Sequence, residues 1–179
     1  AVSDAELKAT FGPSEEHTIR VFLPDRYDEG VALYHKQYAA LHGMCPEPFE
    51  GIRELLAFLR RKGVILGVVT GKGAKSADMT FEKYGLAGYF SDVETGTPEQ
   101  ANKAPGIRRI VERHGLRPEE VVYVGDAPSD ISFAREAGVG VIAVAYASTT
   151  DAGELAAMKP DELFHSVGAM RAYFEKIFA

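Results

Sequence analysis

The feature that most constrains the fold is an alternation of short apolar runs with helix-like segments after residue 50. Apolar runs at 64–70, 121–125 and 139–145 predict strands, with shorter ones expected at 92–95 and 163–165. Such runs are typical of strands buried on both faces of a parallel sheet. Helical spacing marks the segments between them, and parallel strands need such crossovers. The pattern therefore predicts an α/β fold with a Rossmann-type parallel sheet between helical layers.

The first 50 residues show a different pattern. Ser3 and Glu6 have the spacing of a capping box at a helix start. Apolar residues then recur at steps of three and four from Tyr27 to Leu41, which predicts an amphipathic helix ended by Gly43. Two nearby prolines in 44–48 break the chain. We expect a small helical unit over 1–45 and an α/β core over 46–179.

Composition excludes several classes of protein. The formal net charge is −6 and no basic run occurs, which disfavours nucleic acid as a partner. The longest apolar stretch, 137–147, is about half of the ~20 residues that span a membrane, and the first residues do not resemble a signal peptide. We expect a soluble, cytoplasmic protein.

The cysteine and these histidines do not indicate a disulfide or a metal site. Cys45 is the only cysteine, so an intramolecular disulfide is excluded, and we expect it to be a small buried residue. His17, His35 and His42 lack metal-ligand spacing, so we expect them to pack or to face solvent.

Polar residues follow two of the expected strands. Residues 64–70 lead into Thr70 and Gly71, residues 121–125 lead into Asp126 and Asp130, and Lys103 lies between them in sequence. Ligands bind at the carboxyl ends of parallel strands, so we expect these groups to converge.

Carboxylates suit Mg²⁺, whereas a lysine, a hydroxyl and a glycine amide suit a phosphoryl group. The two aspartates also have a structural alternative. Asp126 precedes Pro128 and could cap a helix, and Asp130 could favour the dipole in its first turn.

These segments resemble motifs of the haloacid dehalogenase-like hydrolase superfamily, most of all its phosphoglycolate phosphatase and pyrophosphatase-like branch. Residues 68–72 resemble the second motif, Lys103 the third and residues 124–131 the fourth, while 48–51 resemble the opening of the core. The resemblance implies a three-layer α/β/α core with a helical cap, of which 1–45 would be the larger part. Ala104 stands where the family has proline after the lysine of its third motif.

The resemblance also implies a mechanism. An aspartate at the end of the first strand attacks phosphorus and forms an aspartyl-phosphate, and a second aspartate two residues later acts as acid and base. Asp126 and Asp130 would hold Mg²⁺, and Thr70 and the Gly71 amide would bind phosphoryl oxygens. Lys103 would neutralise charge and orient the nucleophile.

No Asp-x-Asp motif occurs in the 179 residues, and Asp25 and Asp28 have the wrong spacing. In the family this motif precedes the cap. We therefore expect it upstream of residue 1, on a central strand between those that end at Thr70 and Asp126. Without that strand, backbone groups of both neighbours would be unpaired.

The function expected is Mg²⁺-dependent hydrolysis of a small phosphate monoester such as phosphoglycolate, without nucleic acid or membrane partners and with the oligomeric state open. One alternative is a catalytically inactive module that binds phosphate and metal. A phosphomutase or a phosphonate hydrolase of the same superfamily is another. Turnover of p-nitrophenyl phosphate separates the enzyme from the inactive module.

Overall fold

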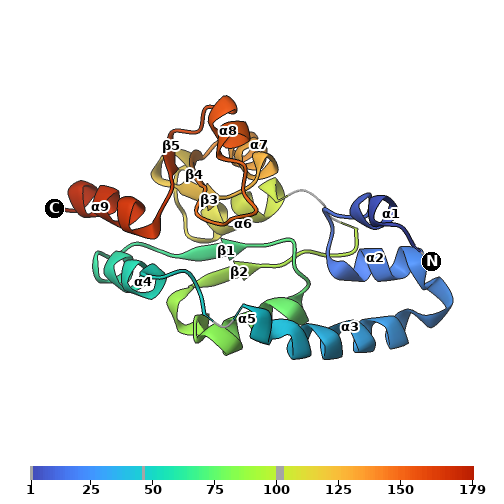
Figure 1. The fold of residues 1–179 in the computed structure, drawn as a ribbon. Helices are drawn as coiled ribbons and strands as arrows, with labels where there is room; N and C mark the ends of the chain where they lie inside the picture. Colours follow the sequence, from blue (N-terminus) through green and yellow to red (C-terminus); the bar gives the residue numbers. More distant parts are fainter. Residues whose placement is uncertain (1, 46, 100–102) are drawn as a thin grey trace. The chain divides into compact units, whose positions relative to one another are not determined.

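The computed structural model describes residues 2–45, 47–99 and 103–179. The chain divides into two compact units: unit one is Ala1–Pro48 with Gly67–Lys103, and unit two is Phe49–Leu66 with Ala104–Ala179. Figure 1 labels the helices and strands. Unit one contains α1 (Asp4–Lys8), α2 (Glu15–Phe22), α3 (Tyr27–Leu41), β1 (Gly67–Val69), α5 (Ala74–Tyr84), β2 (Asp92–Glu94) and the 3-10 helices Pro24–Arg26, His42–Met44 and Ala87–Tyr89. Unit two contains α4 (Ile52–Arg61), α6 (Ala104–Arg113), the 3-10 helix Pro118–Glu120, β3 (Val122–Gly125), α7 (Pro128–Ala137), β4 (Gly140–Val144), α8 (Ala152–Ala157), β5 (Glu162–Phe164) and α9 (Val167–Ile177).

The helices of unit one follow their local sequence signals. The backbone N–H of Glu6 donates to Ser3 Oγ at 3.3 Å, and the Ser3 N–H donates to Glu6 Oε2 at 2.8 Å, which confirms the capping box. α3 has the predicted bounds, and α5 ends at Gly85, whose φ of +61° suits glycine. α2 was not predicted. Its sequence signal is Ser14 followed by two glutamates in the first turn.

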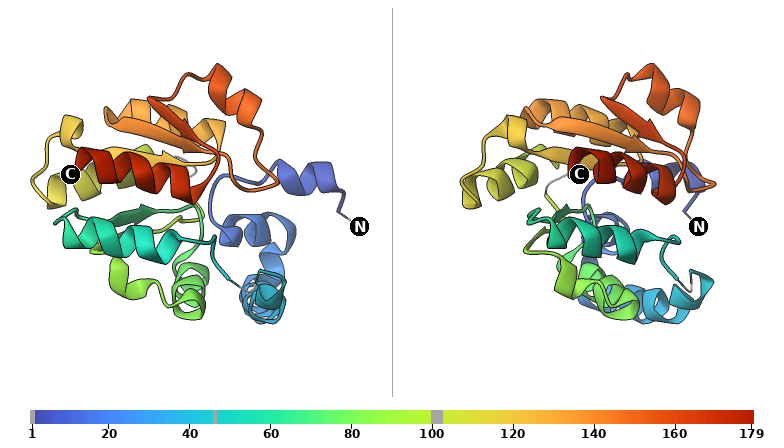
Figure 2. Two further views of the ribbon diagram at one scale, coloured as in Figure 1. Left: turned by 60° about the vertical axis from the view of Figure 1, so that its left-hand side comes forward. Right: turned by 90° about the vertical axis from the view of Figure 1, so that its left-hand side faces the viewer.

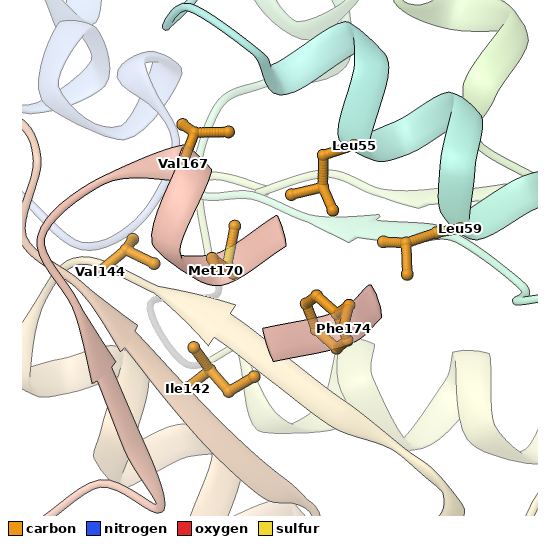
Figure 3. Close-up of a cluster of buried hydrophobic side chains, with 7 residues drawn as sticks. All are labelled: Leu55, Leu59, Ile142, Val144, Val167, Met170 and Phe174. Atoms are coloured by element: carbon orange, nitrogen blue, oxygen red, sulfur yellow. The ribbon is translucent and has the colours of Figure 1, made fainter. Parts of the chain in front are cut away.

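Unit two is built on a parallel sheet in the order β3-β4-β5. α9 lies against one face of the sheet, and α4 lies beside α9 (Figure 2). Their apolar side chains meet those of β4 in a buried cluster (Figure 3). Because strand side chains alternate between faces, Val141 and Ala143 point to the opposite face, where α7 contacts β3 and β4. The unit is a three-layer α/β/α sandwich. The buried cluster consists of Leu55, Leu59, Ile142, Val144, Val167, Met170 and Phe174.

Burial differs sharply among the strands. β4 has a neighbour on each side and is almost wholly buried, as predicted. For 121–125 the prediction of burial on both faces is wrong, because Val122 and Val124 are 43% and 39% exposed. They share a face with Gly140 and Ile142, their register partners, but the buried cluster on that face includes Ile142 and neither valine. Among the described strands, β3 pairs with β4 alone.

The run at 64–70 is also less regular than predicted. The strand begins at Gly67, and Ile65 is 42% exposed. Val64 and Leu66 pack against the buried cluster of unit two instead of extending β1. β1 pairs with β2 in parallel, in a second and separate sheet. The parallel α/β class is confirmed, and the expected strand between β1 and β3 stays a prediction.

Two further predictions concern single features. Cys45 is exposed, so the prediction that it is buried is wrong: it directly follows the 3-10 helix His42–Met44, in the exposed stretch 43–45. Pro46, at the expected domain boundary, lies outside the described residues. Within the ranges that the structure describes, no helix has both the length and the hydropathy needed to cross a lipid bilayer.

Candidate active site

Asp126 lies at the carboxyl end of β3, at a pocket of about 250 Å³ in unit two. The pocket is formed by the carboxyl ends of β3 and β4, by the residues that follow them and by the segment before α4. Phe49 and Tyr146 form an aromatic wall, with ring centroids 4.9 Å apart in an edge-to-face arrangement. Asp126 is solvent-exposed, so its carboxylate is accessible at a mainly apolar pocket. The lining residues are Phe49, Val124, Gly125, Asp126, Val144, Tyr146 and Ala147.

Asp130 is buried, with 2% of its surface exposed. Its Oδ2 accepts hydrogen bonds from the backbone N–H groups of Asp126 and Ala127, at 3.2 and 3.3 Å. The Tyr123 hydroxyl lies 3.4 Å from Oδ1 as a donor. Asp130 therefore caps the first turn of α7, and the same contacts hold the Asp126 backbone in place.

Gly125 is required by the position of Asp130. A Cβ at residue 125 would lie 2.5 Å from Asp130 Cβ and 2.6 Å from its Oδ2. Glycine thus allows the Asp130 side chain to fold back over the end of β3 and reach the two amides. The backbone path of this segment therefore requires glycine at residue 125 if the Asp130 side chain is to take this position.

The pKa values of two tyrosines are raised near these aspartates. Burial raises the pKa of the Tyr123 hydroxyl well above its usual range, and the Asp130 carboxylate beside it raises it further. Burial also raises the pKa of Tyr146, with a further contribution from the charge of Asp126. Both hydroxyls are protonated near neutral pH, and that of Tyr123 faces the Asp130 carboxylate as a donor.

Thr70 and Gly71 belong to unit one, where they follow β1. The Thr70 N–H donates to the Glu94 carbonyl at 2.9 Å, which extends the β1–β2 pairing by one bond. Thr70 Oγ1 accepts from the Lys72 N–H at 3.2 Å, and the Lys72 carbonyl accepts from the Gly96 N–H at 2.8 Å. The loop is thus a tight turn closed on itself and on the segment after β2.

Lys72 and Lys103 lie in different surroundings. Lys72 donates to the Tyr38 hydroxyl at 3.0 Å and lies 5.0 Å from that ring's centroid, so its charge is turned towards α3. Lys103 is half-buried and directly precedes α6. Within unit two, the structure brings the Asp130 carboxylate to the backbone N–H of Asp126. Thr70 and Gly71, neighbours in sequence, lie within unit one. The roles assigned to these four residues and to Lys103 remain predictions.

One polar cluster was missed from the sequence. Glu15, Glu16 and His35 carry ligand-type atoms that all lie within 4.8 Å of one another, and His35 Nε2 is 4.0 Å from Glu15 Oε1. The residues come from α2 and α3, and sequence spacing cannot reveal a pairing made by helix packing. The available signal was the pair of glutamates in the first turn of a helix that itself went unpredicted.

Tyr34 borders this cluster and gives a testable pH dependence. Burial, followed by the Glu15 charge, raises the pKa of Tyr34 from 10.0 to about 12. Because the folded state favours the protonated hydroxyl, its contribution to stability is complete below pH 10 and is lost as the pH rises towards 12. We expect the free energy of unfolding to fall more steeply between pH 10 and 12 in the wild type than in Tyr34→Phe. Urea unfolding at both ends of this range measures it, and parallel pH profiles would contradict the assignment.

The chain is similar to a known protein family over most of its length. The sequence profile of the haloacid dehalogenase-like hydrolases matches residues 1–144. The chain belongs to the haloacid dehalogenase-like hydrolase family. The match extends from the helical segment through β4, and it includes Thr70, Lys103, Asp126 and Asp130.

Two relatives illustrate the sequence similarity. A phosphoglycolate phosphatase of Synechococcus elongatus is 33% identical over 118 residues, which are 66% of this chain and 55% of that protein. The pyrophosphatase PpaX of Halalkalibacterium halodurans is 32% identical over 139 residues, or 76% of this chain and 64% of that protein. The chain thus spans less than two thirds of the length of either relative.

Solved structures of the family share the fold. A predicted phosphoglycolate phosphatase from Haemophilus somnus matches with a TM-score of 0.72 and 20% identity, over 99% of this chain and 83% of that one. A haloacid dehalogenase-like hydrolase from Streptococcus pneumoniae matches with a TM-score of 0.70 and 24% identity, over 97% and 82% of the two chains. These matches confirm the α/β fold of the family.

Proposed function

We propose that the protein is a Mg²⁺-dependent phosphatase acting on a small phosphate monoester. The observation that carries the proposal is the Asp126 carboxylate at the pocket after β3, on a loop fixed by the buried Asp130. The named relatives, a phosphoglycolate phosphatase and a pyrophosphatase, support phosphoryl chemistry. A small phosphorylated metabolite such as phosphoglycolate is the substrate class proposed, and a cytoplasmic location is part of the same proposal.

The donor set fits Mg²⁺. Asp126 offers exposed carboxylate oxygens at the pocket, and Asp130, buried in the first turn of α7, would be the second carboxylate. Mg²⁺ prefers hard oxygen ligands and is commonly held by one or two carboxylates with waters and a substrate phosphate. When bound, it supplies positive charge that offsets repulsion between an anionic nucleophile and the phosphate.

The other residues act on the phosphoryl group. Thr70 Oγ1 and the Gly71 amide would donate hydrogen bonds to its oxygens, and Lys103 would neutralise charge and orient the nucleophile. Thr70 is suited to this because β2 fixes its backbone through the Glu94 carbonyl. Residues 1–45 would form most of the cap that excludes water from the site.

The nucleophile in this proposal is an aspartate outside the 179 residues, on a strand that pairs with β3. Two observations support this. Among the described strands β3 has one partner, and its Val122 and Val124 side chains are exposed where a further neighbour would help cover them. A segment with alternate apolar residues that ends in Asp-x-Asp would satisfy that edge and place its first carboxylate beside Asp126.

Turnover tests the proposal. We expect the complete native protein to release phosphate from p-nitrophenyl phosphate and phosphoglycolate with Mg²⁺, and to lose this activity in EDTA. Pyrophosphate in the same assay separates the two activities of the named relatives. Binding of Mg²⁺ and inorganic phosphate without any turnover would overturn the phosphatase and favour an inactive binding module.

A further inference from the structure

Glu15 makes an unusual contact for a residue at a helix start. It opens α2, yet its carboxylate reaches the beginning of α5 and accepts hydrogen bonds from the Gly73 N–H, at 2.9 Å, and from the Ser76 hydroxyl. The Glu15 side chain is only 11% exposed, and Ser76 is fully buried. A carboxylate buried to this degree is costly unless such donors compensate it.

This contact supplies a cap that α5 cannot supply itself. The residue at its N-cap is Gly73, which has no side chain and makes no side-chain cap hydrogen bond. The first turn of a helix leaves backbone N–H groups without intrahelical partners and favours negative charge. Glu15 satisfies one of these groups from a different helix, 58 residues away in sequence.

The same contact ends the loop that follows β1. At its start, the Thr70 N–H is bonded to Glu94, and in its middle the Lys72 carbonyl accepts from Gly96. At its end, Gly73 is held by Glu15. Gly71 lies between these anchors, so the direction of its amide depends on both.

Glycine at 73 is part of the arrangement. A Cβ there would lie 2.5–2.6 Å from both carboxylate oxygens of Glu16, so the α2 glutamates pack directly on this backbone. Glu16 Oε2 is buried and has no hydrogen-bond partner within the described residues. Of the two neighbouring carboxylates, Glu15 therefore makes the specific bonds and Glu16 only packs, which provides a matched pair for experiment.

We propose that Glu15 is a positioning residue for phosphoryl binding: through Gly73 and Ser76 it fixes the loop that carries Thr70 and Gly71. This rests on the proposed function of that loop. It adds a coupling between the helical segment before residue 45 and the phosphate-binding turn. A displacement of α2 would release Gly73 and change the affinity for a phosphoryl group without altering any group that touches it.

The test compares Glu15→Ala, Glu15→Gln and Glu16→Ala in the full chain. Amide hydrogen exchange reports on the loop, and titration with inorganic phosphate followed by NMR reports on its function. In Glu15→Ala we expect the Gly73 amide to exchange about tenfold faster or more, since a hydrogen bond to a charged group is lost. We expect phosphate affinity to fall by about the same factor, while the α3 amides stay protected.

Glu15→Gln keeps a carbonyl acceptor and should restore most of the protection and most of the affinity. Glu16→Ala removes a neighbouring carboxylate but no described hydrogen bond, so both readouts should stay within about threefold of the wild type. If Glu15→Ala unfolds the unit and exposes α3, Ser76→Ala takes its place, because it removes the hydroxyl that holds the Glu15 carboxylate. Weaker phosphate binding by Ser76→Ala than by Glu16→Ala would support the inference, and equal binding would overturn it.

Different results would overturn the role of Glu15 and the proposed function. Equal phosphate affinity in wild type and Glu15→Ala, with faster Gly73 exchange, would make Glu15 a helix cap only and overturn the inference alone. A wild type that binds no phosphate at Thr70 and Gly71 would overturn the role of the loop, and with it both proposals.

Discussion

Replacing Asp126 by asparagine is expected to abolish Mg²⁺-dependent phosphate release by the complete protein, with kcat/KM falling about a hundredfold or more. The substitution keeps the size of the side chain but removes the negative charge that holds the cation at the pocket. Stabilisation by a catalytic metal is worth several kcal/mol, and each ~1.4 kcal/mol is a factor of ten in rate. Steady-state rates over a range of Mg²⁺ concentrations measure the effect.

Asp151→Asn is the matched control. Asp151 is an exposed aspartate whose side chain caps α8 through the Gly153 and Glu154 amides, and asparagine caps helices equally well. This variant should keep wild-type activity and stability. If Asp126→Asn retained the wild-type rate and the wild-type response to Mg²⁺, the metal assignment would be wrong.

The second large effect is expected from Gly96→Ala. A Cβ at residue 96 would lie 2.2 Å from the Gly71 carbonyl oxygen and 2.8 Å from its carbonyl carbon. Both atoms are backbone, so no side-chain rotation can relieve the overlap and the loop itself must move. The Gly96 N–H bond to the Lys72 carbonyl would be strained by the same shift.

We expect this variant to lose about 1–3 kcal/mol of stability, the usual cost of forced overpacking, and to bind inorganic phosphate at least about tenfold more weakly. Urea unfolding and phosphate titration measure the two effects. Gly43→Ala is the control, because nothing lies within 4 Å of a Cβ there and the position is exposed. Similar behaviour of the two variants would show that the β1 and β2 loops are not packed as described.

The parts of the fold that could be predicted from the sequence are those set by local residue spacing and composition. The capping box of Ser3, the bounds of α3 and the buried β4 follow from spacing and composition. Prediction failed for α2, and burial was overestimated for Val122, Val124 and Ile65. An apolar run indicates that a strand favours burial. Whether that strand is buried depends on the elements that pack against it.

The sequence predicts residue types for the candidate site, and that prediction remains to be tested, but it does not predict the contacts that hold those residues in place. Strand ends followed by Gly-Asp and Thr-Gly mark positions where a parallel sheet places ligands. The contacts that orient them come from elsewhere: Asp130 folds back over Gly125, and Glu15 reaches Gly73 from another helix. The contact of Glu15 with Gly73 depends on helix packing, which periodicity does not describe.

The most direct test of the account is to identify the residue that carries the phosphoryl group during turnover. The complete native protein would be acid-quenched while it hydrolyses phosphoglycolate with Mg²⁺, and the labelled peptide would be sequenced by mass spectrometry. We expect a phosphoaspartate outside the 179 residues, on an apolar segment that ends in Asp-x-Asp. A phosphorylated residue within the 179, or turnover without any phosphoenzyme, would contradict it.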